Sequence, residues 1–311
     1  MIKKQIEKLV VVTAGSNYLD IDAYACMVAM AELLQLKGVN SIAYSPAPYN
    51  YSVCDALTVG QKIVQELPLN ISEKNTEYII VDVSDPDFLK NSVPIERVIE
   101  VYDHHVGFEK YWTDRIGNGA HIEFIGAAAT LIYREWKCAN LQDKISKQTA
   151  LLLIAAILDN TLNLTSANTT AEDRAAFCEM CEHAGVEENF CVTYFSEVQK
   201  NIESDLKNAL FNDIKIIRNN SVLPSRMAQL CIWNADKIFS KLSEIRRFFD
   251  DTSDSWMINI IDLEHQCSYF VCDDIYYQKT IESFFDVCFE SGVAKSSVPY
   301  LRKEIIKKTM N

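Results

Sequence analysis

Apolar residues in the first 185 positions alternate between short runs and longer segments of helical period. The short runs predict β-strands, which cover residues 9–15 (LVVVTAG), 77–85 (EYIIVDVSD) and 97–105 (RVIEVYDHH). The longer segments predict amphipathic or buried helices, which cover residues 20–38, 125–136 and 147–159. Strands that alternate with helices are typical of a parallel sheet with helices on both faces. The sequence therefore predicts an N-terminal α/β domain.

A further helix is predicted over residues 170–185. Thr170 with Asp173 three positions later forms a capping-box pattern, and Gly185 suits the position that follows the last turn. The segment 186–190 is then a reasonable end for the first domain.

A smaller α/β pattern follows from about residue 200. Its predicted strands lie at 227–233, 255–263 and 267–273, and its predicted helices at 235–249 and 276–292. We predict a first domain at 1–188 and a second at 200–311. In parallel sheets ligands bind where the strands end, so the active site is expected in the cleft between the two domains.

The composition is that of a globular protein. The chain has 311 residues, of which 49% are hydrophobic, and this suffices for packed cores in two domains. No apolar run reaches the roughly 18 to 20 residues of a membrane span, and the first ten residues, MIKKQIEKLV, lack the apolar centre of a secretory signal. We expect a soluble, cytoplasmic protein without a membrane partner.

The charge balance narrows the range of partners. Lys and Arg number 30 against 43 Asp and Glu, which gives a net charge of -13. Such a surface repels phosphate backbones, so binding to duplex nucleic acid is not expected. Small anionic substrates stay open, because bound cations invert the local field. The basic ending LRKEIIKK (301–308) stands out in this acidic chain.

The ten cysteines show no disulfide-like rhythm, which suggests reduced and mostly buried thiols. One cluster, Cys178 and Cys181 with His183 nearby, has the spacing of half a zinc site. A second pair of ligands is not evident, and residues three apart also share one helix face. The structural interpretation is therefore favoured over a zinc site.

Acids and imidazoles gather where predicted strands end and helices begin. The candidates are Asp20, Asp22, Asp82, Asp103, His104, His105 and Asp159. Each has an ordinary alternative: an N-cap for Asp20 or Asp22, a turn for Asp82, and a buried hydrogen-bonded side chain for Asp159. Their convergence at strand ends favours a metal site. Mixed Asp and His donors suit Mn²⁺, Co²⁺ or Mg²⁺ better than structural zinc.

These residues also carry a family resemblance. The motifs LDID, VDVSD, DHH and ILDN stand in the order and spacing of the DHH phosphoesterase superfamily. Residues 124–133 and 155–173 resemble segments of the family II inorganic pyrophosphatases. Residues 204–211, 227–233, 258–272 and 300–306 resemble, more loosely, the C-terminal domain that these enzymes share with exopolyphosphatases. The nuclease branch of the superfamily has a different C-terminal domain.

The resemblance implies a site with two divalent ions, Mn²⁺ first, with Co²⁺ or Mg²⁺ as alternatives. One ion would be held by Asp20 and Asp82. The other ion would be held by Asp22, Asp82, His104 and Asp159, so that Asp82 bridges the two. His105 would face the phosphates, and the second domain would bring Lys207, Arg302 and Lys303 to the phosphoryl group.

The resemblance implies hydrolysis of a phosphoanhydride bond, with inorganic pyrophosphate as the first substrate. The family has a metal-binding His four residues before the first Asp of DxD, but this chain has Ser16 there, with Asn17 beside it. That departure keeps two alternatives open: a short-chain exopolyphosphatase, and a phosphoesterase for nucleotides or other small molecules. A phosphate-binding relative with little turnover is the alternative outside the enzymes. A homodimer is one assembly open to the chain.

Overall fold

The chain forms two compact units, Met1–Cys191 and Val192–Asn311. The structure is a computed structural model that describes residues 8–15, 18–60, 63–66, 75–89, 92–218, 220–250 and 254–310. Among the described residues, no helix is both long and apolar enough to cross a membrane.

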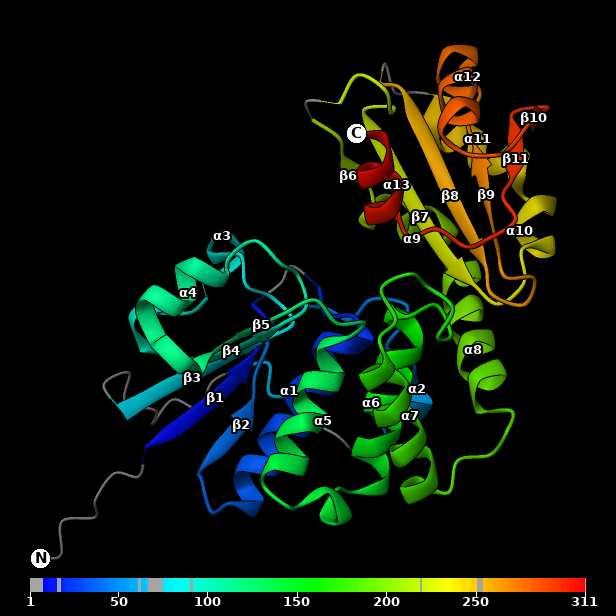
Figure 1. Cartoon of the computed structure of the whole chain (residues 1–311). Helices are drawn as coiled ribbons and strands as arrows, with labels where there is room; N and C mark the ends of the chain where they lie inside the picture. Colours follow the sequence, from blue (N-terminus) through cyan, green and yellow to red (C-terminus); the bar gives the residue numbers. More distant parts are fainter. Residues whose placement is uncertain are drawn as a thin grey trace, which may run out of the picture. The chain divides into compact units, whose positions relative to one another are not determined.

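The first unit is built on a five-stranded parallel sheet with the strand order β2-β1-β3-β4-β5 (Figure 1). The strands are β1 (Leu9–Thr13), β2 (Ser41–Ala43), β3 (Thr76–Val81), β4 (Val98–Asp103) and β5 (Ala120–Ile122). Every neighbouring pair is parallel. The predicted parallel sheet is therefore confirmed, and its central strands are the three apolar runs singled out in the sequence.

Helices cover both faces of this sheet. The helices of this unit include α1 (Ile21–Leu36), α2 (Asp55–Thr58), α3 (Pro86–Leu89), α4 (Glu109–Ile116), α5 (Ala128–Cys138), α6 (Lys147–Asn160) and α7 (Ala171–Ala184); α6 packs on α1, and α7 packs on α6. Short 3-10 turns lie at Ile95–Arg97, Gly117–Gly119 and Gln142–Lys144. Val11, Ile80 and Val101 point to one face, where they pack with Trp112 of α4. Side chains alternate along a strand, so the residues between them point to the opposite face, where α1 and α5 lie (Figure 1).

The predicted ends of α7 are confirmed. The Thr170 hydroxyl accepts a hydrogen bond from the Asp173 N–H (3.2 Å), and the Asp173 carboxylate accepts one from the Thr170 N–H (2.7 Å). Gly185 follows the last turn with φ 59°, in the left-handed region that glycine tolerates. Asp173 also accepts the Gly126 N–H (2.9 Å). The start of α7 is thus fastened to the loop that precedes α5.

The second unit is built on a six-stranded mixed sheet with the order β10-β11-β9-β8-β7-β6. Its strands are β6 (Lys215–Ile216), β7 (Arg226–Ile232), β8 (Trp256–Asp262), β9 (Cys267–Val271), β10 (Phe289–Glu290) and β11 (Val293–Lys295). Only β7 and β8 pair in parallel; the other pairs are antiparallel. The predicted second α/β domain is confirmed as a fold class.

Six helices belong to this part of the chain, as far as the structure describes it. They are α8 (Phe190–Ser204), α9 (Leu206–Asn212), α10 (Asp236–Ser240), α11 (Leu242–Asp250), α12 (Ile275–Phe284) and α13 (Arg302–Thr309). Ile281 of α12 and Ile305 of α13 share a core cluster with Met227, Met257 and Phe270 of the sheet. The two helices therefore cover one face of the sheet.

Two predicted helices were wrong in detail, and one helix was not predicted. The helix predicted over 276–292 ends at Phe284, because Phe285 turns into the core against Phe270, and the remaining residues form the β10–β11 hairpin. Ser291 and Gly292 make its turn with φ 51° and 78°. The helix predicted over 235–249 is broken at Lys241, and α8 was not predicted.

Candidate metal centre

The candidate site lies where the parallel strands of the first unit end. Ala14 follows β1, Asp82 follows β3, and Asp103 closes β4. The strand order turns at β1, which has β2 on one side and β3 on the other. Ligands of open parallel sheets bind at such a point, beyond the carboxyl ends of the strands. A cavity of about 410 Å³ opens there and is lined by Asp20, Asp82, Asp103 and His105 among others.

Four side chains bring metal-binding atoms together in this place. Asp82, Asp103, His104 and His105 each offer one donor atom, and these atoms all lie within 4.8 Å of one another. Asp82 stands in the left-handed region with φ 57°, which an aspartate tolerates better than a bulky residue does. Its N–H donates to the Tyr102 carbonyl (2.8 Å), so the turn after β3 is fixed to β4.

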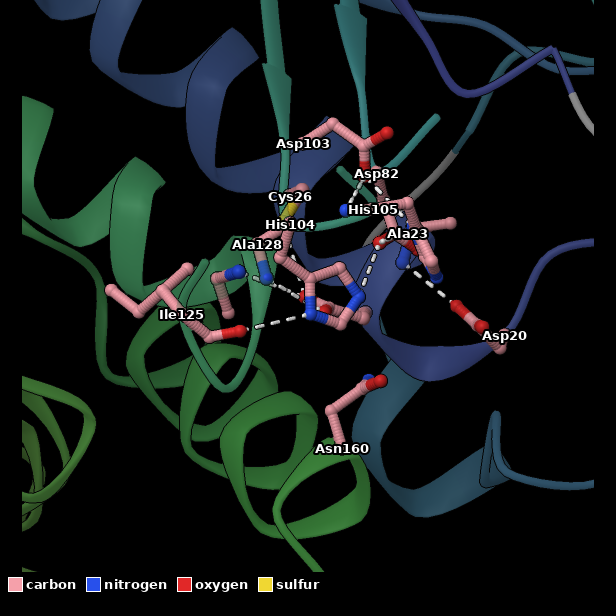
Figure 2. A network of polar contacts seen from close by, with 12 residues as sticks. Asp20, Ala23, Cys26, Asp82, Asp103, His104, His105, Ile125, Ala128 and Asn160 are labelled. Atoms are coloured by element: carbon pink, nitrogen blue, oxygen red, sulfur yellow. Dashed lines mark hydrogen bonds and ion pairs between the residues drawn. The ribbon is translucent and has the colours of Figure 1, made fainter. Parts of the chain in front are cut away.

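His104 is held in one tautomer. Its Nδ1 lies 3.0 Å from the Gly126 carbonyl oxygen and 3.3 Å from that of Ile125, and carbonyls only accept hydrogen bonds. Nδ1 therefore carries the proton in the neutral ring, and Nε2 turns its lone pair toward Asp82 Oδ1 at 3.4 Å (Figure 2). A carbonyl that orients an imidazole in this way is the usual second partner of a metal-binding histidine.

These residues fit a divalent cation. Asp82 Oδ1 is buried and accepts no hydrogen bond from the described residues, although the Asp82 side chain is only 6% exposed. A carboxylate oxygen and an imidazole lone pair that face each other need a proton or a cation between them. The donor set of Asp and His oxygens and nitrogens suits Mn²⁺, Co²⁺ or Mg²⁺.

Asp103 and His105 form a second pair beside the first. Asp103 Oδ1 lies 2.8 Å from His105 Nδ1 and accepts the His105 N–H at 3.0 Å. Burial opposes ionisation of Asp103, but these hydrogen bonds outweigh it and hold the pKa of Asp103 below its ordinary value. Asp103 thus orients the His105 imidazole, while 58% of the His105 side chain stays exposed, and His105 lines the cavity.

Asp20 and Asp22 lie at the start of α1 and play different local roles. Asp20 is the N-cap, and its Oδ1 accepts the Ala23 N–H at 2.9 Å. Asp22 is fully buried and accepts the N–H groups of Ala128 (2.9 Å) and Ala129 (2.8 Å) at the start of α5. Asp20 therefore caps α1, and Asp22 joins two helices.

Burial and mutual repulsion raise the pKa values of this carboxylate group. Burial first, and then the charge of Asp20, raise the pKa of Asp22 to about 7. Burial and the charges of Asp22 and Asp20 also raise the pKa of Asp82 well above its ordinary value. The three acids are therefore close enough to resist joint ionisation, and a bound cation would relieve that resistance.

Replacing Asp22 by alanine is expected to lower the free energy of unfolding by about 1–3 kcal/mol, because two buried N–H groups of α5 lose their acceptor. The measurement is urea unfolding of the metal-free protein at pH 7, followed by circular dichroism. Asp22→Asn keeps an amide oxygen and should lose less. An unchanged midpoint for Asp22→Ala would show that Asp22 does not hold α5.

Asp159 lies in the last turn of α6, half-buried, and is not part of the group formed by Asp82, Asp103, His104 and His105. The next residue, Asn160, projects its amide toward the side of the site where His104 and Asp82 lie (Figure 2). After α6 three consecutive residues, Leu162 to Leu164, have φ between 51° and 62°, which costs roughly 1–2 kcal/mol for each L-residue. Asn160 was not predicted from the sequence, although it directly follows the predicted Asp159.

The three predicted cations belong to the second unit. Arg302 Nη2 lies 2.9 Å from Asp213 Oδ1 and Nη1 lies 3.0 Å from Asp213 Oδ2, a two-pronged ion pair. Lys207 Nζ lies 5.8 Å from the ring centre of Phe248, and Lys303 is exposed on α13. Their predicted contact with phosphate stays a prediction. The prediction about Ser16 and Asn17 concerns residues outside the described ranges.

The cysteine cluster of α7 has ordinary surroundings. Cys178 is exposed and Cys181 is partly buried, and His183 Nε2 lies 2.9 Å from the Ile145 carbonyl oxygen. Burial first, and then Cys178, raise the pKa of Cys181 to about 11, which opposes thiolate formation. The residues that the structure describes bring no further ligand to this cluster. The structural interpretation of the motif is therefore the better one.

The fold and the donor group define an α/β protein of two units with an Asp and His site at the strand ends of the first. In sequence the chain is 28% identical over 183 residues to a probable manganese-dependent inorganic pyrophosphatase of Bacillus mycoides. The aligned segment covers 57% of this chain and 56% of that protein. A probable manganese-dependent inorganic pyrophosphatase of Bacillus cereus is also 28% identical, over 179 residues, with the same coverage. The chain thus matches these curated relatives over about half their length. No family model matches it.

Solved structures support the fold over nearly the whole chain. A candidate family II inorganic pyrophosphatase from Methanococcus jannaschii superposes with a TM-score of 0.63 at 19% identity, covering 97% of this chain and 99% of that one. An exopolyphosphatase-related protein from Bacteroides fragilis reaches a TM-score of 0.50 at 13% identity, covering 97% and 90%. The predicted resemblance to family II inorganic pyrophosphatases is confirmed.

Proposed function

We propose that this protein is a metal-dependent hydrolase of phosphoanhydride bonds, with inorganic pyrophosphate as its first substrate. The observation that carries the proposal is the buried pair of Asp82 Oδ1 and His104 Nε2, 3.4 Å apart at the end of the parallel strands. The manganese-dependent pyrophosphatases to which the chain is similar support the choice of substrate.

The proposed ligand set keeps the residues predicted from the sequence. Asp20, Asp22, Asp82, His104 and Asp159 would hold two divalent ions, Mn²⁺ first and Co²⁺ or Mg²⁺ as alternatives. Asn160 is added as a neutral oxygen donor, since its amide projects toward the same place (Figure 2). When bound, such ions lower the pKa of a water molecule and neutralise phosphoryl oxygens.

The protein's own groups supply orientation and proton control. Asp103 fixes the His105 ring, so that His105 can present its other nitrogen to a phosphate oxygen in the cavity. His104 is kept in the tautomer that presents Nε2. Arg302, Lys207 and Lys303 would stabilise charge on the phosphates, and Arg302 must exchange its Asp213 partner for that purpose. We also propose a cytoplasmic location; a homodimer stays open.

The test is phosphate release from pyrophosphate and tripolyphosphate, each with Mn²⁺, Co²⁺, Mg²⁺ or a chelator. We expect release from pyrophosphate with Mn²⁺ and none with the chelator, because the charge of the substrate repels hydroxide until cations neutralise it. Preference for tripolyphosphate would favour the exopolyphosphatase alternative. Absence of phosphate release from both compounds with every metal would refute the proposed function.

A further inference from the structure

The cavity at the candidate metal centre is lined by two kinds of residue. The polar lining consists of Asp20, Asp82, Ser84, Asp85, Asp103 and His105. The apolar lining consists of Ala14, Tyr18, Ala23, Val83, Phe88, Val106 and Phe108. All of these residues belong to the first unit.

Three residues of the apolar lining have strongly exposed side chains. Phe88 is 54% exposed, Val106 is 56% exposed and Tyr18 is 38% exposed. Beneath them Val83 and Phe108 are partly buried against the core of the sheet. Exposed apolar groups are common singly, but a group that lines a cavity beside a polar centre is typical of a ligand site.

Phe88 is presented by a firm support. It belongs to the four-residue helix α3, whose Leu89 is fully buried in the core cluster that contains Trp112. Trp112 Nε1 donates to the Ser84 carbonyl (2.6 Å), and the Ser84 hydroxyl donates to the His105 carbonyl (3.1 Å). The loops after β3 and β4 are thereby fastened together, and Leu89 anchors the short helix that carries Phe88.

The size of the cavity indicates an organic ligand. A volume of about 410 Å³ falls in the range of roughly 300–1,000 Å³ that is usual for pockets that take organic molecules. Among the described residues that line the cavity there is no Lys or Arg. A bare polyanion would make no use of the apolar lining, whereas a phosphate compound with a flat ring could contact both kinds of residue.

We infer that this cavity takes a phosphate compound whose phosphate lies at the Asp and His group and whose planar ring lies on Phe88, Val106 and Tyr18, such as a nucleoside diphosphate. The placement of the phosphate rests on the proposed function. The placement of the ring rests on the apolar lining alone. Stacking of a base on an aromatic side chain is sequence-tolerant and contributes substantially to binding.

The test compares two analogues that the site cannot cleave at the bridge. They are methylenediphosphonate, which mimics pyrophosphate, and its adenosine ester, and each is titrated into the Mn²⁺-loaded protein by isothermal calorimetry. We expect the adenosine ester to bind roughly tenfold more tightly, which lies within the range for one base–aromatic stack. Phe88→Ala should reduce that ratio to about one while the affinity for methylenediphosphonate stays unchanged.

Phe124→Ala is the matched control, because Phe124 is 66% exposed and does not line the cavity. It should leave both affinities unchanged. Equal affinity of the wild-type protein for the two analogues overturns the inference and leaves the proposed function standing. An equal loss of both affinities in Phe88→Ala also overturns it. Failure of both analogues to bind would refute the proposed function itself.

Discussion

Replacing Asp82 by asparagine is expected to reduce pyrophosphate hydrolysis by more than about 100-fold, because even the outer partners of metal ligands contribute about 10–100-fold. Asp82 is the residue on which the proposed metal site rests: its Oδ1 is buried, faces His104 Nε2 at 3.4 Å, and accepts no hydrogen bond from the described residues. An amide keeps the shape of the carboxylate but removes the charge that holds a cation. The measurement is initial phosphate release at saturating Mn²⁺.

Asp114→Asn is a suitable control for this experiment. Asp114 lies on α4, is 59% exposed and pairs with Lys110 at 2.7 Å, so its replacement should leave activity within about twofold. Because Asp82 resists ionisation in the metal-free fold, Asp82→Asn should fold normally, which circular dichroism checks. Near-normal turnover by a folded Asp82→Asn variant would show that Asp82 holds no metal.

Removal of divalent metal is expected to lower the melting temperature, and this decrease in melting temperature should become larger as pH rises. At a metal concentration of 100 times Kd the stabilisation is about 2.7 kcal/mol, which corresponds to roughly 5–11 °C for a unit of this size. Burial and the charge of Asp20 raise the pKa of Asp22 to about 7 in the metal-free fold. The folded metal-free protein therefore holds a proton that the unfolded chain has released, and it loses stability as pH rises from about 4 through 7.

Metal binding needs the ionised carboxylates, so its stabilising effect should increase over the same pH range. The difference in melting temperature between Mn²⁺ and chelator should be small at pH 5 and should level off above pH 8. Differential scanning fluorimetry at half-unit pH steps measures it, with Asp82→Asn as the variant that should show little difference at any pH. A difference that is constant from pH 5 to pH 8.5 would mean that these carboxylates do not bind the ion.

Local patterns predicted the fold well where one physical signal was decisive. The capping box of Thr170 and Asp173 and the left-handed Gly185 determine both ends of α7, and both were visible in the sequence. The helix predicted over 276–292 was too long, because the apolar residues that continue its pattern beyond Phe284 pack into the core or form the β10–β11 hairpin. Periodicity does not distinguish a helix face from a turn that buries the same side chains.

The site was predictable where strand ends determine position. Asp82 and His104 were placed together because the carboxyl ends of β3 and β4 meet at one edge of a parallel sheet. The end of α6 gave no such rule, since neighbouring helical residues point about 100° apart and the sequence does not say whether Asp159 or Asn160 faces the site. The exposure of Phe88 was equally hidden, because it depends on Leu89 anchoring α3 in the core.

The ion pair of Arg302 and Asp213 has a consequence for affinity. Asp213 offers Arg302 the same fork of two oxygens that a phosphate group would offer, at 2.9 Å and 3.0 Å. Any anion recruited by Arg302 competes with an acceptor of its own chain, which is present at a fixed and high effective concentration. The apparent dissociation constant of such an anion is therefore weakened by the cost of displacing Asp213. If Arg302 binds phosphate as proposed, anions that replace both hydrogen bonds of Asp213 would be favoured over those that replace one, and Asp213 would make Arg302 selective.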